Sequence, residues 1–200
     1  MNKKPTGKTG FIRISPNGAN YHQTIFPETK EEIEKFITER FVNNLNQQNL
    51  FLQIKQFQKN IENDFDFILD TSLGKRDMDL MEIAPKDFLN KGYSKIPNHY
   101  FDIDLGKKVW DKIEEKSNHY GNKKQKLFLL IYSTDFRLNL SEICIQYLKY
   151  LANKNEHCFE MIFYFSLLTN QEGIGRVIYP TDVLDFDEDK HKNDAVFSLL

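Results

Sequence analysis

The sequence predicts one domain of the α/β (or α+β) class, with a mixed central sheet flanked by helices, and three observations lead to this prediction. Apolar residues recur at helical spacing over residues 28–46, acidic segments with alternating polarity follow, and two continuous apolar segments enclose a second helical pattern. A chain of 200 residues, of which 40% are hydrophobic, is long enough to close a single core.

The first predicted helix spans about residues 28–46. Ile33, Ile37 and Phe41 recur every four residues, and Pro27 stands just ahead of the segment. Its first turns carry acidic residues, which the helix dipole favours at that end: Glu28, Glu31 and Glu32. The pattern therefore predicts an amphipathic helix.

Three strands are expected next. Residues 50–58 alternate between apolar and polar side chains. Residues 64–70 read Asp-Phe-Asp-Phe-Ile-Leu-Asp, an alternation that sends aromatic and carboxylate side chains to opposite faces. Gly74 supplies a turn and residues 78–84 run up to Pro85, so the last two strands are expected to pair as an antiparallel hairpin.

The second half of the chain predicts a parallel crossover. Residues 127–132 and 159–167 are continuously apolar, as expected of strands covered on both faces, and a helical pattern over residues 140–151 separates them. The two strands should therefore be adjacent and parallel through a right-handed connection. A short strand at residues 173–179 closes the sheet. A further helix is expected at residues 105–120, with a buried side of Val109, Trp110, Ile113 and Ser117.

The two ends of the chain differ from this middle. Residues 1–27 combine lysines with glycines and prolines, which favours an irregular basic arm with one short strand at Gly10–Ser15. Residues 181–200 form an acidic tail that is expected to be solvated. The globular domain is accordingly predicted to span residues 28–180.

Composition restricts the compartment and the partners. Neither long apolar stretch approaches the roughly 20 residues that cross a bilayer. Cys144 and Cys158 show neither a disulfide framework nor a metal-binding spacing, which fits a reducing cytosol. Twenty-seven basic against 29 acidic residues exclude a wholly basic, nucleic-acid-coating protein but leave room for a local basic face. We therefore expect a cytoplasmic protein that does not enter a membrane.

Two carboxylates on neighbouring strands form the candidate site. Asp66 lies at the front of one predicted strand, and Glu82 lies sixteen residues later within the next. Carboxylates on adjacent strands can share a hard divalent cation, because Mg²⁺ takes oxygen ligands and usually keeps several waters. Such a cation activates water and neutralises a phosphodiester in its transition state.

The pattern Phe65-Asp66 followed by Glu82-Ile83-Ala84 resembles the motif of the PD-(D/E)XK nuclease superfamily, which has the restriction-endonuclease-like fold. In the order of elements the resemblance covers about residues 28–168. It implies that Asp66 and Glu82 hold Mg²⁺ (or Mn²⁺), and the Ile83 carbonyl is a further candidate ligand.

The sequence departs from the superfamily's motif at two positions. Phe65 replaces the proline, and Ala84 stands where a lysine assists the attacking water. Some members supply that lysine from the following helix, and Lys112 and Lys116 lie four residues apart on the helix expected there. A glutamate on the first helix often completes the site; the candidates are Glu32 and Glu39.

The predicted function is that of a divalent-metal-dependent nuclease that hydrolyses phosphodiester bonds in DNA or RNA. The alternative is a non-catalytic, nuclease-like module that binds protein or nucleic acid, and Ala84 is its main support. A third interpretation is an unrelated α/β domain in which Asp66, Asp79 and Glu82 are ordinary strand residues and the lysines form a solvated helix face.

Overall fold

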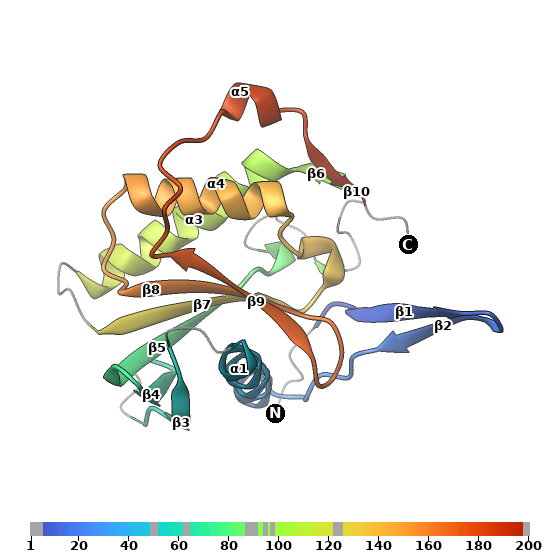
Figure 1. Ribbon diagram of the computed structural model, residues 1–200, viewed down its shortest axis with the longest axis horizontal. Helices are drawn as coiled ribbons and strands as arrows, with labels where there is room; N and C mark the ends of the chain where they lie inside the picture. The colour runs from blue at the N-terminus through green and yellow to red at the C-terminus, as the bar shows by residue number, and fades with distance from the viewer. Residues whose placement is uncertain are drawn as a thin grey trace.

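A six-stranded mixed sheet forms the centre of the protein, with the strand order β3-β4-β5-β7-β8-β9 (Figure 1). Its strands are β3 (Ile54–Lys59), β4 (Phe67–Thr71), β5 (Gly74–Glu82), β7 (Leu127–Ser133), β8 (Met161–Leu167) and β9 (Gly173–Tyr179). The computed structural model describes residues 6–48, 52–61, 65–86, 92–93, 96, 99–121 and 126–197.

Helices cover both faces of the sheet. Helix α1 (Lys30–Gln47) packs on one face, and helices α3 (Asp102–Tyr120) and α4 (Glu142–Lys154) pack on the other (Figure 1). The predicted class, a mixed sheet flanked by helices, is therefore confirmed. The residues expected on the buried side of α3 are all buried: Val109, Trp110, Ile113 and Ser117.

Helix α1 begins with a capping box, which explains where it starts. The hydroxyl oxygen of Thr29 accepts the N–H of Glu32, and the Glu32 carboxylate accepts the N–H of Thr29. Behind this cap, Ile33, Ile37 and Phe41 are completely buried against the sheet. The spacing that predicted the helix is thus the spacing of its core contacts.

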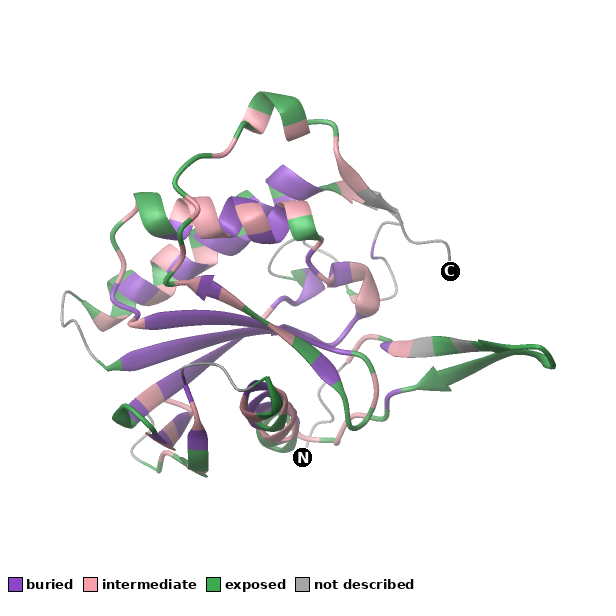
Figure 2. Cartoon of the chain, viewed as in Figure 1, coloured by how far each residue is buried: buried purple, intermediate pink, exposed green. Residues whose placement is uncertain are grey.

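The directions of the strands agree with the expected connections. Strands β3, β4 and β5 form an antiparallel meander, β5 pairs with β7 in parallel, and β7 pairs with β8 in parallel. Both β7 and β8 are buried along their whole length (Figure 2). The predicted parallel neighbours are therefore confirmed. The last strand, β9, returns antiparallel to β8.

The acidic strand begins later than the sequence suggested. Strand β4 starts at Phe67, so Asp66 stands immediately before it, and Asp64 lies outside the described residues. Phe65 was expected on the same face as Phe67. Instead its ring lies 5.0 Å from the ring of Tyr120 on α3, because the chain has left the sheet at that point.

Both ends of the chain contain regular structure. The expected strand at Gly10–Ser15 forms as β1, and it pairs with a strand that was not expected, β2 (Gly18–Gln23), in a hairpin that projects from the body (Figure 1). Near the other end, helix α5 (Glu188–His191) precedes β10 (Ala195–Phe197), which pairs with β6 (His99–Phe101). In the described part of the chain, no helix is long and apolar enough to cross a membrane.

Candidate functional site

Two carboxylates lie opposite each other at the start of β4, one just before this strand and one on β5. The register of the hairpin pairs Phe67 with Met78, so the next residues outward, Asp66 and Asp79, stand opposite each other. Oδ2 of Asp66 accepts the N–H of Leu80 at 2.7 Å, which holds the carboxylate against β5. We call Asp66 and Asp79 the carboxylate pair.

The carboxylate pair places two like charges next to each other. Burial, together with the neighbouring carboxyl group of Asp79, raises the pKa of Asp66 to about 7, although the N–H of Leu80 opposes the rise. Keeping both groups ionised at neutral pH is therefore costly. A proton or a nearby cation relieves this repulsion, and perturbed pKa values of this origin are common at functional sites.

Helix α3 brings a cation and a hydroxyl to the carboxylate pair. The Nζ atom of Lys116 lies 2.5 Å from Oδ2 of Asp79, and the hydroxyl of Tyr120 donates to the same oxygen at 2.6 Å. Lys116 and Tyr120 share a helix face because they are four residues apart. Asp79 itself is only 5% exposed. Lys116, one of the two predicted lysines, therefore reaches the strands.

The other predicted lysine, Lys112, lies one turn earlier on α3 and pairs with a glutamate instead. Nζ of Lys112 is 2.5 Å from the carboxylate of Glu115, an exposed pair on one turn of α3. Exposed pairs of this type contribute little free energy and place no charge at a buried site. The structure thus separates Lys116 from Lys112.

Helix α1 contributes a glutamate, but not one of those expected. Glu34 is buried, and its Oε1 lies 3.3 Å from Nζ of Lys30. Partial burial lowers the pKa of Lys30, but the charges of Glu34, Asp66 and Asp79 outweigh it and leave that pKa raised. The pKa of this one ammonium group is therefore raised by carboxylates on α1, just before β4 and on β5.

The two glutamates suggested by the sequence have other contacts. Glu32 forms part of the capping box, and Glu39 lies 3.0 Å from the guanidinium of Arg40. Glu34 escaped the prediction although it follows the buried Ile33 and lies one turn before the buried Thr38. Glu34, Thr38 and Val42 form a second buried stripe of the helix, and a search for polar residues along this stripe would have found Glu34.

Glu82 lies at the end of β5, three residues beyond Asp79. Its Oε1 accepts hydrogen bonds from the hydroxyls of Tyr93 and Thr134, both at 2.8 Å. Side chains alternate along a strand, so Glu82 and Asp79 point to opposite faces, with their Cα atoms about 10 Å apart. On β5, Asp66 contacts Asp79 and Leu80, and the predicted pairing of Asp66 with Glu82 is replaced by these contacts.

Glu82 still belongs to the same acidic region. Burial, followed by the charges of Glu82, Glu34 and Asp66, raises the pKa of Tyr132 well above its usual value. Carboxylates on α1, just before β4 and on β5 therefore all raise the pKa of one buried hydroxyl. Ile83, the further candidate ligand, has a fully buried side chain, and its N–H donates to the carbonyl of Tyr132 at 2.7 Å.

The donor set suits a cation that keeps part of its water shell. No group of three or more His, Cys, Asp or Glu side chains within the described ranges is arranged to hold a metal ion. The carboxylate pair offers oxygen ligands from two residues. Mg²⁺ is commonly held by one or two carboxylates, with waters and substrate phosphates completing its octahedron. Two carboxylates are thus a donor set of the kind that Mg²⁺ and Mn²⁺ use.

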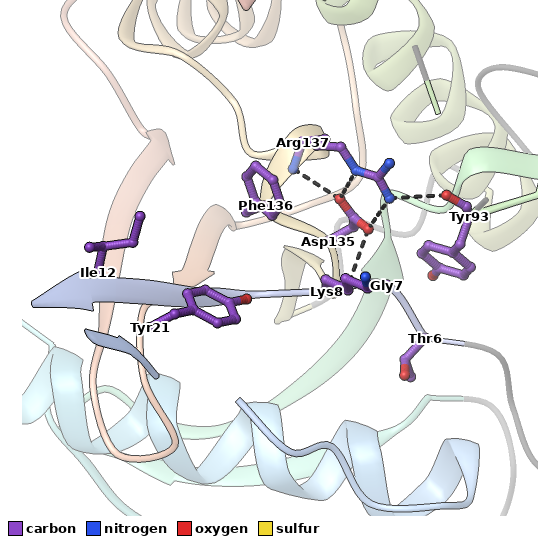
Figure 3. Close-up of a pocket in the computed structure, with 9 residues that line it drawn as sticks. All are labelled: Thr6, Gly7, Lys8, Ile12, Tyr21, Tyr93, Asp135, Phe136 and Arg137. Atoms are coloured by element: carbon purple, nitrogen blue, oxygen red, sulfur yellow. Dashed lines mark hydrogen bonds and ion pairs between the residues drawn. The ribbon is translucent and has the colours of Figure 1, made fainter. Parts of the chain in front are cut away.

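A pocket of about 650 Å³ lies beyond the end of β5. Its wall combines rings and an aliphatic side chain with two cationic residues (Figure 3); these are Ile12, Tyr21, Tyr93, Phe136, Lys8 and Arg137. Tyr93 links this strand-end pocket to the acidic region, because its hydroxyl donates to Glu82.

A buried carboxylate fixes one wall of the strand-end pocket. Asp135 is 0% exposed and accepts the N–H of Lys8 at 3.0 Å. Its two oxygens also accept the Nε and Nη2 groups of Arg137, at 2.8 and 2.7 Å. A methyl group at Gly7 would overlap the side chain of Asp135, so glycine permits the arm to approach this closely.

Comparisons of the chain with protein-family models, with curated proteins and with solved structures gave no match. The class of protein is therefore defined by its fold and site alone. It is a mixed α/β domain that carries a buried carboxylate pair, a lysine beside the pair and a pocket at the adjacent strand end.

Proposed function

We propose that this protein is a divalent-metal-dependent nuclease related to the restriction-endonuclease-like proteins. The observation that carries the proposal is the carboxylate pair, in which Asp66 has a pKa of about 7 because it is buried beside Asp79, with Lys116 2.5 Å from the latter. The order of elements on which the resemblance rests, a helix, three strands, a helix, a strand, a helix and a strand, supports the same function; the short strand β6 is an addition to it.

Each residue of the site has a distinct task in this proposal. Asp66 and Asp79 hold the cation through their carboxylate oxygens. When bound, the cation supplies a water of lowered pKa and neutralises the phosphate oxygens. Lys116 presents a positive charge for the phosphate on the α3 side, and Tyr120 orients Asp79 through its hydrogen bond. Glu82 adds negative charge at the edge of the site but is not a ligand of the cation in this proposal.

The proposal changes one ligand from the sequence-based prediction. Asp79 replaces Glu82 as the partner of Asp66, because it is Asp79 that lies opposite Asp66 in the hairpin. Lys116 takes the role that Ala84 lacks the side chain to perform. Nucleic acid is accordingly the proposed partner and Mg²⁺ or Mn²⁺ the proposed cofactor. The proposed compartment is the cytosol, where the buried thiols of Cys144 and Cys158 stay reduced.

A cleavage assay tests the proposal. End-labelled single- and double-stranded DNA and RNA are incubated with the protein and Mg²⁺ or Mn²⁺, alongside Asp79→Asn and a control, Asp70→Asn. Asp70 is a suitable control because it is a half-buried aspartate on β4, four residues after Asp66 and near the hairpin turn. We expect the parent and the control to cut at least one substrate, and Asp79→Asn to be slower by about 100-fold or more.

The same assay decides against the proposal if the result differs. A parent protein that cuts none of the four substrates, or an Asp79→Asn variant that cuts as fast as the parent, removes the nuclease function. Retention of nucleic-acid binding without cleavage would then favour the second candidate, a non-catalytic nuclease-like binding module. The ion pair and hydrogen bond that already engage Oδ2 of Asp79 are the observations in favour of that candidate.

A further inference from the structure

We infer that the strand-end pocket binds one unstacked nucleobase of a single-stranded nucleic acid, an inference that rests on the nuclease function proposed for the carboxylate pair. The occupant is one base of the strand on which the carboxylate pair acts. The pocket would thus hold the strand in register for the reaction.

The lining of the pocket is suited to a flat, neutral ring. Tyr21 comes from the hairpin, Tyr93 from the segment after β5, and Phe136 from the turn after β7, and Figure 3 shows these side chains around one space. Tyr21 and Ile12 are 48% and 47% exposed, so the pocket presents apolar surface to water. Aromatic side chains in such positions stack with bases of any identity.

The charges of the pocket favour a base over a free phosphate ion or a carboxylate. Arg137 is the strongest cation in the wall, but its guanidinium is bound by both oxygens of Asp135, so the two charges largely cancel. What remains is a rigid, polar edge suited to hydrogen bonding, and the exposed Lys8 at the mouth, where a backbone phosphate would lie. A nucleotide has this combination of a neutral ring and an external anion.

The size of the pocket and its aromatic lining favour an unstacked base. A volume of about 650 Å³ falls within the usual range for small-molecule sites and accommodates a nucleotide. A base inside a duplex is stacked on both sides and cannot present a free face to the rings of the pocket. Single-stranded nucleic acid can enter it without the cost of unpairing.

The position of Tyr93 connects the pocket to the carboxylates. Its ring lines the pocket, and its hydroxyl donates to Glu82 at 2.8 Å. Glu82 lies three residues along β5 from Asp79, about 10 Å between Cα atoms. A strand with one base in the pocket would therefore lie beside Glu82, at the edge of the acidic region.

Binding of a labelled ten-nucleotide DNA strand tests this inference. Fluorescence anisotropy is recorded in Ca²⁺, an oxygen-binding cation used in place of Mg²⁺, with an intact strand and with a strand that has a central abasic residue. The variants are Tyr21→Ala, Phe136→Ala and Tyr21→Phe. The matched control is Ile14→Ala, because Ile14 is an 82% exposed residue of the same hairpin that does not line the pocket.

We expect the parent to bind the intact strand roughly tenfold more tightly than the abasic strand, since one stacked ring is lost. Tyr21→Ala and Phe136→Ala should lose a similar factor on the intact strand and should no longer distinguish the two strands. Tyr21→Phe and Ile14→Ala should behave like the parent. Thermal melting of each variant shows whether it is folded.

Two further arms identify the source of the base. A ten-nucleotide RNA strand should show the same dependence on the base, whereas free adenosine monophosphate should bind far more weakly than either strand. Equal binding of intact and abasic strands by the parent overturns the inference, as does parent-like binding by Tyr21→Ala and Phe136→Ala. Adenosine monophosphate that binds as tightly as the strands overturns it too.

The outcome separates this inference from the nuclease function. A parent that cleaves nucleic acid but shows no dependence on the base retains the nuclease function and loses the pocket. A parent that binds strands in a base-dependent manner but cleaves none retains the pocket and loses the nuclease function. Absence of both binding and cleavage removes the two together.

Discussion

Two carboxylates, the half-buried Asp66 and the fully buried Asp135, show opposite ways of accommodating a negative charge. Asp135 is completely buried, and its oxygens accept the guanidinium of Arg137 and the N–H of Lys8. Asp66 is half-buried beside a second carboxylate, and its pKa is raised to about 7. The first charge is compensated by a guanidinium and an N–H, whereas the second lies beside a like charge that favours its protonated form.

We infer from this difference that Asp135 has a structural task and that Asp66 belongs to the proposed site. A charge that is paired and hydrogen-bonded on all sides stabilises one arrangement of the chain and offers little to a ligand. A charge held next to a like charge destabilises the folded state and is retained where function requires it. Asp135 accordingly fixes the arm against the turn after β7, and Asp66 marks the candidate site.

The largest effect expected from this comparison is the loss of stability on Asp135→Asn. The amide cannot accept both Nε and Nη2 of Arg137 and leaves that cation without a counter-charge. We expect the free energy of unfolding in urea to fall by about 3 kcal/mol. The exposed Asp185→Asn serves as the control. A fall of less than about 0.5 kcal/mol would show that Asp135 is not a structural anchor.

A smaller loss is expected for Lys116→Met. The variant removes the ammonium from Asp79 but leaves the hydrogen bond from Tyr120, and Lys116 is itself 31% exposed. We expect a decrease of about 1–2 kcal/mol in the free energy of unfolding at pH 8. Lys112→Met is the matched control on the same helix, because Lys112 pairs with Glu115 at the surface. Equal effects of the two variants would contradict the special position of Lys116.

The smallest effect has the opposite sign. The folded protein binds a proton at Asp66 more tightly than the unfolded chain does, because the pKa rises from 3.8 to about 7. The stability contributed by this group is therefore present at acid pH and is lost as the pH rises from about 4 to about 7. Asp66→Asn removes this loss, and we expect it to stabilise the protein at pH 8 by about 0.5–1 kcal/mol, allowing for partial solvent screening.

Urea titrations of the parent and Asp66→Asn across pH 4–8 check that prediction. The two proteins should differ little at pH 4 and diverge towards pH 8, with the variant the more stable. Parallel pH profiles, or a variant that is less stable at pH 8, would contradict the interpretation of Asp66 as an uncompensated charge.

Much of the fold could be predicted from local patterns. The uninterrupted apolar segments of β7 and β8 and the helical spacing between them were sufficient for the parallel crossover, because such strands must be covered on both faces. The hairpin of the arm was only half predicted. All residues of β2 are exposed, so no burial pattern in the sequence marks that strand.

The carboxylate pair was predictable in principle, but spacing along the chain selected the wrong partner. The turn before Gly74, whose φ is +91°, pairs Thr71 with Gly74, and counting outward from there places Asp79 opposite Asp66. The motif-based choice of Glu82 ignored this register. Hairpin geometry, rather than sequence distance, decides which side chains meet.

The strand-end pocket could not be predicted in the same way. Tyr21, Tyr93 and Phe136 lie far apart in the chain and meet only because the arm packs against the turn after β7. No local pattern encodes that contact. Gly7 is a necessary part of it, but a glycine in an arm rich in glycine and proline carries no signal of its own.

Calorimetric titration with Mn²⁺ and Mg²⁺ at pH 7.5 tests the central claim, that the carboxylate pair of Asp66 and Asp79 is a cation site. The parent should bind one ion weakly, as expected of a site that retains waters, with release of protons because Asp66 titrates near this pH. Asp66→Asn and Asp79→Asn should each abolish binding, while Glu82→Gln should bind within about threefold of the parent. Undiminished binding by Asp79→Asn, or no binding by the parent, would contradict the claim.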